Sequence, residues 1–469
     1  MTGRSPLPPT LSPLPRAGEG GARVSGRVRA DGASRRGPTR SVSALTLTPA
    51  LSRTRERGQV SSSPDAIAPG AMNGGGRAGP GRAIPALTGI RGVAALWVVF
   101  YHMHEFARFD PRFAPLSAVP LVREGFRGVD LFFILSGFIL MHVHRGDFVG
   151  LRGPAVSRFL RARFWRVYPL NAAVLVLIIA LYLALPGFHD PAALDPAGVV
   201  QSFALAQRWF VPDFGSVNGP AWSLSVEVLG YAAFPLIAVA LNRLGPRAAL
   251  VGAMLCLALL VAAAVLLGFA DRNVTGRVGV VRMFPAFVAG AALAAFYAAV
   301  GRDGDAARSV AGGRLATACF AASLAVCFIP PLGVLAPVAM AGLILGLAFE
   351  RGPVNRLMAS APALWLGKIS FSLYLTNLLV IDLLVWLLAG HRGAAGPAEC
   401  AAFAAATLLA VLAVAASVYH LVERPAARLS RRLLPASHER PIPAHAAPGG
   451  AVARAGPVAA HPGATQGAG

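Results

Sequence analysis

Two apolar stretches of the sequence contain ionisable side chains whose types and spacing suit chemistry. Residues 87–104 (LTGIRGVAALWVVFYHMH) contain Arg91 and His102, and residues 128–140 (GVDLFFILSGFIL) contain Asp130. Both stretches are apolar enough to cross a bilayer, where an ionisable side chain costs about 3 kcal/mol or more and therefore marks a candidate functional site. Arg91 and His102 are 11 residues apart. On a helix they share one face, about 16 Å apart.

The candidate acid–base residues are His102, Asp130 and Glu227. Alternation of the spans places His102 and Asp130 near the outer ends of the first two, and WSLSVE (222–227) enters a later span from the same side. We expect the three side chains to converge in the outer half of the bundle. A histidine beside a carboxylate is held in one tautomer and made more basic, which suits a general base acting on a hydroxyl. The alternative is that they form buried pairs that stabilise helix contacts.

Arginines at the start of a third span are the candidate anion-binding residues. In RFLRARFWRVYPL (158–170), Arg163 and Arg166 are three residues apart. They share a helical face and can hold a di-anion such as a nucleotide phosphate by bidentate hydrogen bonds. The alternative, which these residues alone favour, is anchoring at the inner membrane surface and contact with lipid head groups. Arg91 lies deeper in the membrane, so we expect it to bind an anion.

Polar side chains also occur in GKISFSLYLTNLLV (367–380) and in the terminal HLVERP (420–425). Serine and threonine in such helices usually bond to their own backbone or to a neighbouring helix, and Asn377 is the exception. We take Trp222, Ser225 and Asn377 as candidate substrate-binding residues, and we expect Glu423 to pair with a loop arginine. Neither HExxH nor CxxC occurs, so no metal site is predicted.

The composition indicates a membrane protein. Of 469 residues, 55% are hydrophobic and 14% are charged, which is too apolar for a soluble chain of this length. The net charge of +22 does not indicate nucleic-acid binding, because the arginines lie between apolar runs or in the tails, without an aromatic-interleaved basic domain. The four cysteines have no paired spacing, so neither a disulfide nor a metal framework is expected.

Hydropathy predicts an all-α bundle of about ten transmembrane spans. Loops rich in arginine alternate with loops that have few, although the first loop breaks the contrast with Arg108, Arg112, Arg123 and Arg127. By the positive-inside rule, both termini are predicted to be cytoplasmic. The expected spans are 85–105, 128–144, 166–186, 224–242, 247–270, 278–299, 313–329, 332–349, 367–389 and 398–420.

The predicted organisation is one membrane domain between two tails. Residues 1–82 are rich in Pro, Gly, Ser and Arg and are expected to be disordered; we expect translation to start at Met72. Residues 83–432 form the membrane domain, and residues 433–469 are expected to be a disordered tail. In the outer loop 187–221, the apolar piece 199–210 is too short to span and is expected to be interfacial or re-entrant.

Six of these motifs, in this order, resemble the acyltransferase family 3 membrane proteins, which modify cell-surface carbohydrates and some secreted small molecules. The resemblance covers the chain from about residue 83 to 432. It rests on the Arg91-to-His102 spacing, on GVDLFFILSGFIL, on RFWRVYPL and WSLSVE, and on SFSLYLTN and the terminal ERP.

The resemblance implies transfer of an acyl group, often acetyl, from cytoplasmic acyl-coenzyme A (acyl-CoA) to a hydroxyl of an acceptor. His102 would match the catalytic histidine with Arg91 as its partner, and Arg163 and Arg166 the arginine pair linked to donor binding. Glu227 would match the acidic residue of the WSLSxE-type segment. This sequence departs from the family at Asn377, where members commonly carry histidine, so that proton transfer is lost there and at most hydrogen bonding remains.

The sequence therefore predicts an integral-membrane O-acyltransferase of the bacterial cytoplasmic membrane, in which Asp130 orients His102. Its expected partners are acyl-CoA as donor, a carbohydrate or lipid-linked glycan acceptor and membrane lipids; no permanently bound cofactor is expected. The alternative is a proton- or anion-coupled transporter with the same buried residues as its path. We find no internal symmetry between the halves, which counts against that alternative. A non-catalytic scaffold would not need Arg91 or His102 in the membrane, and homo-oligomerisation stays open.

Overall fold

The computed structural model describes residues 83–189, 194–209, 216–268, 278–301, 305–389 and 396–433. Within them the chain is helical and contains no β-strand. The predicted extension 1–82, with Met72, lies outside the described residues, as does the tail 433–469 apart from Leu433.

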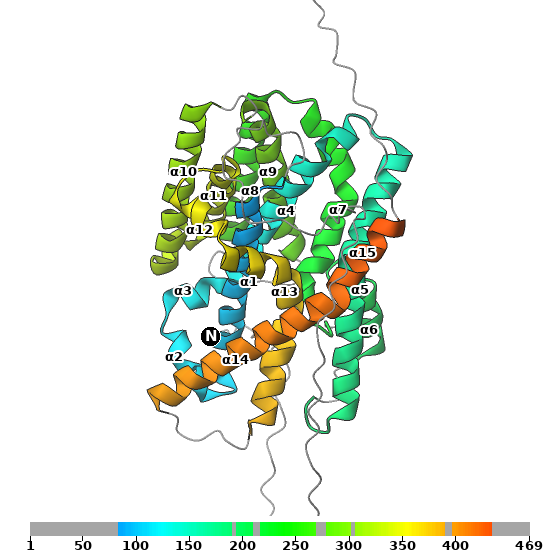
Figure 1. The fold of residues 1–469 in the computed structure, drawn as a ribbon, viewed down its shortest axis with the longest axis vertical. Helices are drawn as coiled ribbons and strands as arrows, with labels where there is room; N and C mark the ends of the chain where they lie inside the picture. The colour runs from blue at the N-terminus through cyan, green and yellow to red at the C-terminus, as the bar shows by residue number, and fades with distance from the viewer. Residues whose placement is uncertain are drawn as a thin grey trace, which may run out of the picture.

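Ten helices of the described chain are long and apolar enough to cross a membrane, which confirms the predicted bundle of about ten spans. They pack side by side, with α1 and α13 in the middle of the molecule (Figure 1). The sidedness of the termini stays a prediction. The main α-helices of these ten spans, some of which are extended by short 3-10 or α-helical turns, are α1 (Pro85–Glu105), α4 (Gly128–His144), α5 (Gly153–Ala184), α7 (Ala221–Asn242), α8 (Pro246–Leu266), α9 (Val278–Val300), α10 (Ala306–Ala325), α11 (Ala336–Ala348), α13 (Ala361–Leu387) and α14 (Pro397–Val418).

Shorter helices connect or extend the spans. One turn of π-helix, Tyr419–Glu423, joins α14 to α15, and the two helices run obliquely across the bundle to reach α5 (Figure 1). Residues 199–203 of the expected interfacial piece 199–210 belong to a short helix, α6, which begins at an Asp195 N-cap. The shorter helices are α2 (Ala114–Ser117), α3 (Pro120–Arg123), α6 (Pro196–Phe203), α12 (Pro353–Met358) and α15 (Arg424–Leu433).

Two helix pairs form the centre of the bundle because glycines remove the side chains between them. A Cβ on Gly92 of α1 would lie 2.4 Å from the backbone N of Gly367 on α13, and one on Gly137 of α4 would lie 1.9 Å from the carbonyl O of Phe287 on α9. Contacts this close are typical of small residues at membrane helix interfaces. They fix the register of α1 on α13 and of α4 on α9.

The third span is longer than predicted. Helix α5 begins at Gly153 rather than near residue 166 and has 32 residues, or about 48 Å at the usual helical rise. That exceeds the roughly 30 Å of a hydrocarbon core. Arg163 and Arg166 therefore lie within the helix rather than on a segment that leads into it.

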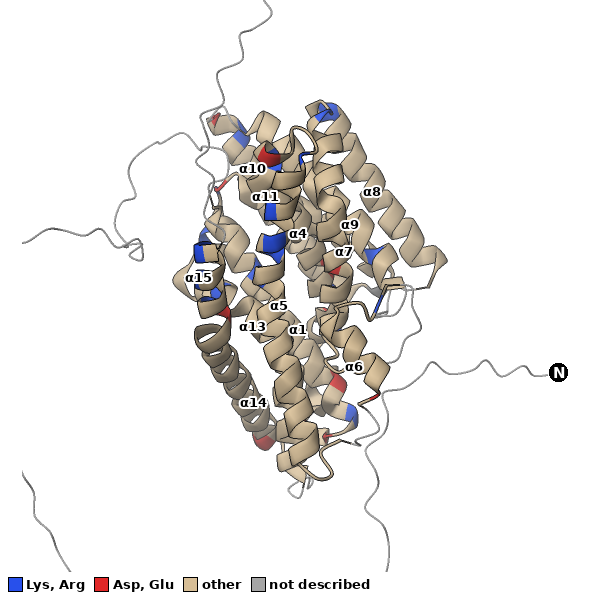
Figure 2. Cartoon of the chain, turned by 90° about the vertical axis from the view of Figure 1, so that its right-hand side faces the viewer, with Lys and Arg blue, Asp and Glu red and all other residues tan. Residues whose placement is uncertain are grey.

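Figure 2 shows basic residues mainly in the upper part of the bundle, on α15 at mid-height and near the upper ends of α8 and α10. The arginines of the first loop, which broke the predicted contrast, mostly have acidic neighbours. Arg108 pairs with Glu105 at 2.9 Å, Arg112 with Asp110 at 2.6 Å, and Arg127 with Glu124 at 2.5 Å. The hydrogen bonds that the Arg112 guanidinium donates to the Asp110 carboxylate raise the pKa of Arg112. Local acids thus offset most of the basic charge that this loop adds.

Candidate functional site

Arg91 of α1 is held directly against α13. Its Nε donates to Ser370 Oγ at 3.0 Å, and its Nη2 donates to the carbonyl O of Gly367 at 2.9 Å. The glycine crossing of α1 on α13 places this carbonyl within reach. Neither partner is charged, so the positive charge of Arg91 is not offset by the groups that it touches.

Arg166 of α5 pairs with Glu423, which also accepts a hydrogen bond from Ser372 Oγ at 2.7 Å. Its guanidinium carbon lies 5.2 Å from the centre of the Phe371 ring. Glu423 ends the π-helical turn, and such turns occur frequently at functional sites. The expectation that Glu423 pairs with an arginine is confirmed, although the arginine belongs to a helix rather than to a loop.

Glu227 of α7 accepts from Ser136 Oγ of α4 at 2.5 Å and from the Tyr231 hydroxyl, one helical turn away, at 2.8 Å. Its charge also interacts with Arg163 and Arg166. Glu227 therefore belongs to the arginine side of the site. The predicted convergence of Glu227 with His102 and Asp130 is not seen, because these side chains have other hydrogen-bonding partners.

We call Arg91, Arg163, Arg166, Glu227 and Glu423 the arginine cluster, since their charges interact across α1, α5, α7 and the π turn. Three guanidinium groups face two carboxylates, which leaves one positive charge in excess. The Nε of Arg163 is buried and makes no hydrogen bond within the described residues. An excess cation with an unused donor is suited to bind an anion.

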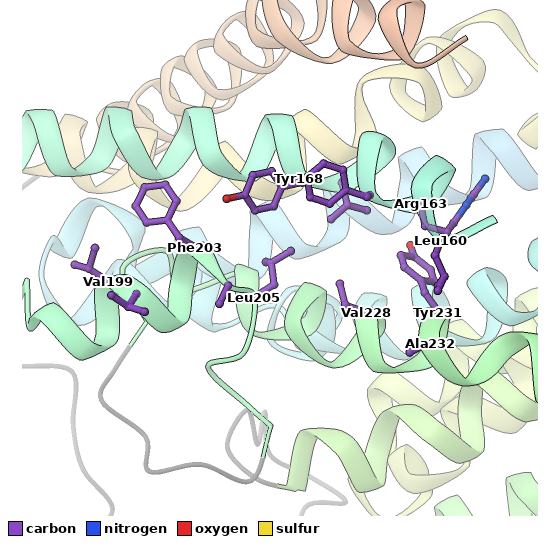
Figure 3. Close-up of a pocket in the computed structure, with 13 residues that line it drawn as sticks. Leu160, Arg163, Tyr168, Val199, Phe203, Leu205, Val228, Tyr231 and Ala232 are labelled. Atoms are coloured by element: carbon purple, nitrogen blue, oxygen red, sulfur yellow. The ribbon is translucent and has the colours of Figure 1, made fainter. Parts of the chain in front are cut away.

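A cavity of about 740 Å³ between α5, α6 and α7 meets the arginine cluster. Arg163 and Tyr231 lie at one end of it, and Val199 and Phe203 of α6 lie at the other (Figure 3). Its wall is otherwise almost entirely apolar, with Phe164 half exposed. The cavity thus combines one cationic end with a long hydrocarbon-like wall.

His102 lies farther along α1 and forms a hydrogen bond with Asn377 of α13, with 2.5 Å between His102 Nδ1 and Asn377 Oδ1. The Nδ2 of Asn377 donates to the carbonyl oxygens of Leu373 and Tyr374 at 3.0 and 2.7 Å. Because both amide hydrogens are used, Oδ1 acts as acceptor and His102 Nδ1 carries the proton in the neutral ring. The Nε2 lone pair is then available as a base. Asn377 therefore takes part through hydrogen bonds alone.

Asp130 does not orient His102, which corrects the predicted pair. Its two oxygens accept from Arg282 of α9, with distances of 2.5 Å to Nε and 2.9 Å to Nη2. Both side chains are at most 5% exposed. The α4–α9 contact brings a full positive charge to Asp130, and a buried carboxylate is stabilised far more by a guanidinium than by a neutral imidazole.

Trp222 and Ser225 are buried in the packing of α7. The Trp222 ring lies 6.1 Å from Phe133 and 5.9 Å from the guanidinium carbon of Arg282. Ser225 Oγ accepts from the backbone N of Arg208 at 3.3 Å. Neither residue lines the 740 Å³ cavity. Their predicted contact with substrate stays a prediction.

Sequence reasoning missed Arg282 and Tyr231. Arg282 lies in an apolar run (VGVVRMFPAF), so the rule that selected Arg91 would have found it. Tyr231 is four residues after Glu227 and shares its helix face. Helical spacing was the available signal for that residue.

The acyltransferase domain model known as acyltransferase 3 matches residues 84–421. This range includes the His102–Asn377 pair and all of the arginine cluster apart from Glu423. The chain belongs to the acyltransferase 3 family. Its similarity to that family extends over most of the described bundle, as the resemblance of the motifs predicted.

Among relatives of this acyltransferase 3 protein, the acyltransferase MdmB of Streptomyces mycarofaciens is 32% identical over 158 residues, 33% of this chain and 38% of the relative. The peptidoglycan O-acetyltransferase OatA of Listeria monocytogenes is 26% identical over 163 residues, 32% of this chain and 24% of the relative. Protein 2 in the picA locus of Rhizobium radiobacter is 33% identical over 187 residues, 37% of this chain and 87% of the relative. The match thus spans a minor part of the two relatives named for acyl transfer. No solved structure matches the chain significantly.

Proposed function

We propose that this multi-pass membrane protein is an O-acyltransferase that moves an acyl group, with acetyl expected, from acyl-CoA to a hydroxyl of a cell-surface carbohydrate or a related acceptor. The bacterial cytoplasmic membrane is its proposed location, with the arginine cluster toward the cytoplasm. The observation that carries the proposal is the excess of three arginines over two glutamates inside the bundle. Membership of the acyltransferase 3 family and the names of two relatives support it.

The arginine cluster holds the phosphates of the donor in this proposal. Arg163 offers an Nε that makes no hydrogen bond in the described part of the chain, and Arg166 is 34% exposed although it is paired with Glu423. Guanidinium groups bind phosphate oxygens through two parallel hydrogen bonds, which gives direction as well as affinity. Arg91, held by neutral partners, adds attraction deeper in the bundle.

His102 is the proposed general base. Its Nε2 accepts the proton of the acceptor hydroxyl, and the oxygen attacks the thioester carbonyl carbon. The carbon–sulfur bond breaks, and the imidazolium returns the proton to the leaving thiolate. The products are an ester and free coenzyme A. Asn377 fixes the ring and its tautomer through Nδ1, so that Nε2 faces the reaction as the acceptor.

The two parts are separated along one surface of the bundle. On α1, Arg91 precedes His102 by 11 residues, a rise of about 16 Å. On α13 the groups that they contact, Ser370 and Asn377, occur in the same order. A donor anchored at the arginines must therefore extend its flexible arm along the α1–α13 contact to bring the thioester to His102.

The test is acyl-CoA binding and thioester hydrolysis by the full chain in detergent. We expect Arg163→Ala/Arg166→Ala to weaken donor binding by about tenfold or more, because each charge-assisted hydrogen bond contributes about 1.5–3 kcal/mol. His102→Ala should bind donor normally and lose about 10²–10⁴-fold in turnover. Arg161→Ala is the matched control, since Arg161 is an exposed arginine of the same helix whose Nε donates to the carbonyl O of Ser157, one turn earlier.

Retained turnover in His102→Ala would exclude this histidine as the base. If the wild-type protein binds no acyl-CoA but moves protons or anions across vesicles, the protein is a transporter and the proposal fails.

A further inference from the structure

A second polar group lies at the opposite end of the bundle from the arginine cluster. It consists of His189, just after α5, and Asp382 of α13. The two form a hydrogen bond, with 2.5 Å between His189 Nε2 and Asp382 Oδ2. Their side chains are 28% and 20% exposed. The pair is therefore reachable by a ligand, unlike the Asp130–Arg282 pair.

Aromatic rings surround this pair. Tyr182 stacks on the imidazole of His189, with 4.2 Å between ring centroids and 13° between planes. Phe188 meets His189 nearly edge-on at 4.9 Å, and Trp386 lies 5.5 Å from Phe188. We call Tyr182, Phe188, His189, Asp382 and Trp386 the aromatic pair site.

Several polar atoms of the site have no partner in the described part of the chain. His189 uses Nε2 toward Asp382, and that contact involves only Oδ2 of the carboxylate. The structure gives no hydrogen bond within the described residues to His189 Nδ1, to Asp382 Oδ1 or to the Tyr182 hydroxyl. The site therefore offers a ligand one imidazole nitrogen, one carboxylate oxygen and one hydroxyl, all close to aromatic rings.

Helix α13 shows where the site lies relative to the proposed reaction. Ser370 touches Arg91, Asn377 touches His102 and Asp382 touches His189. At the helical rise these contacts are about 10 Å and then about 8 Å apart along the axis. Helix α5 gives the same order, since Tyr182 follows Arg166 by 16 residues. The aromatic pair site therefore lies beyond His102 as seen from the proposed donor site.

We propose that the aromatic pair site binds the acceptor, as a subsite for a polyhydroxylated, carbohydrate-like ligand. This rests on the proposed function. Asp382 Oδ1 accepts hydrogen bonds from ligand hydroxyls, and His189 Nδ1 and the Tyr182 hydroxyl bond to neighbouring ones. The partly exposed rings of Tyr182 and Trp386 cover the apolar C–H surface of the ligand, whereas Phe188 is fully buried and supports the site from behind. The polar groups fix the orientation of the ligand in this mostly apolar setting.

The competing explanation is a structural clamp that holds the turn after α5 against α13. Substitutions that spare the fold separate the two. Asp382→Asn keeps the shape and removes the charge, and Trp386→Leu removes a ring. The matched control is Asp147→Asn, because His144 and Asp147 form a similar partly exposed pair, with 2.9 Å between Nδ1 and Oδ2, on the other side of the membrane domain.

The experiment measures binding of maltotriose, as the carbohydrate probe, to the full chain in detergent by saturation-transfer NMR, and donor binding separately. We expect Asp382→Asn to weaken probe binding about tenfold or more, as for loss of a charged hydrogen bond, and to leave acyl-CoA binding and the unfolding temperature near wild type. Asp147→Asn should leave maltotriose binding unchanged, because its pair lies at the other end of the bundle. If the wild-type protein binds maltotriose no better than Asp382→Asn does, the assignment of this subsite is wrong. An equal loss of probe binding, donor binding and thermal stability also overturns it and identifies a clamp.

Failure of the proposed function has a different signature. Wild type would then bind no acyl-CoA, whatever its affinity for maltotriose. Should transfer to maltotriose be observed, Asp382→Asn is expected to raise KM for the probe and to leave kcat nearly unchanged, since the subsite binds the acceptor and does not move the proton.

Discussion

Two groups of intramembrane charges in the described chain, the Asp130–Arg282 pair and the arginine cluster, differ in balance and in access. Asp130 and Arg282 form a one-to-one pair with two hydrogen bonds, and both side chains are at most 5% exposed. The arginine cluster has three cations and two anions, with Arg166 34% exposed and the Arg163 Nε without a hydrogen bond in the described chain. We call the Asp130–Arg282 pair closed, because its charges balance and it is shielded from solvent. We call the arginine cluster open, because it has excess positive charge and a partly exposed member.

The difference teaches how to sort costly charges in a membrane protein. An ionisable residue in a span is a functional candidate by default, yet Asp130 has a complete set of internal partners and little room for a ligand. Such a pair contributes chiefly to holding α4 against α9. Excess charge and unused donors, rather than burial alone, distinguish the binding site.

The largest effect is expected from breaking the closed pair. Asp130→Ala leaves Arg282 buried without its counter-charge and should destabilise the fold by about 3–5 kcal/mol. Thermal unfolding in detergent, followed by tryptophan fluorescence, measures it. The double variant Asp130→Leu/Arg282→Leu should recover most of the loss, because no uncompensated charge remains. If Asp130→Ala unfolds like wild type and loses only turnover, the pair is part of the chemistry and the contrast fails.

A smaller and different effect is expected from the open cluster. Arg91→Ala should weaken acyl-CoA binding by about 10- to 100-fold through loss of a charged donor, with little change in the unfolding temperature, since its partners are a hydroxyl and a carbonyl that also bond to each other, at 2.9 Å. Calorimetric titration of the donor measures it. Arg91→Lys should retain part of the affinity. A loss of stability as large as that of Asp130→Ala would contradict the distinction.

Asn377 tests whether His102 depends on its neutral partner. Asn377→Leu removes the hydrogen bond to Nδ1 and should lower kcat by about three- to tenfold, while acyl-CoA binding stays near wild type. Asn377→His should restore turnover, because an imidazole can again accept at this position. Steady-state kinetics of the three proteins give the answer, and equal kcat in all of them would show that Asn377 does not position the base.

The smallest effect is expected from raising the charge excess of the cluster. Glu423→Gln keeps the shape of the side chain and its contact with Ser372 but removes one negative charge. Because the carboxylate then no longer competes with the donor's phosphates for Arg166, donor affinity should rise about twofold to fivefold. The gain should shrink at high salt. Binding measured at two ionic strengths checks both points. Weaker binding would mean that Glu423 orients Arg166 for the donor instead of competing with it.

The architecture was predictable because the bilayer restricts the choice of structure. A spanning segment must satisfy its own backbone hydrogen bonds and must be apolar over a fixed length, so the ten spans and their order follow from the sequence. The same constraint selected Arg91 and His102, since an ionisable group in such a segment needs a reason. The pairing of Glu423 with an arginine was also anticipated.

Partner choice was not predictable in the same way. Sequence position gives the depth of a side chain in the membrane, but it does not give the neighbour that it faces. Asp130 was expected to meet His102, and it meets Arg282, 152 residues away, because glycines place α4 on α9. Likewise, His102 meets Asn377 because of the register between α1 and α13. The His189–Asp382 contact depends on how α5 ends beside α13, for which the sequence has no local signal.

The glycine crossing of α1 on α13 has a mechanical consequence. With backbones in direct contact at Gly92 and Gly367, sliding or tilting of one helix requires the other to follow, so the two behave as one rigid body. Helix α5 is joined to its neighbours α13 and α7 through much sparser packing. It carries Arg163 and Arg166 near one end and Tyr182 near the other. We therefore expect α5 to move more easily than the α1–α13 pair, and because it is one continuous helix, a tilt that opens one end would also shift the other.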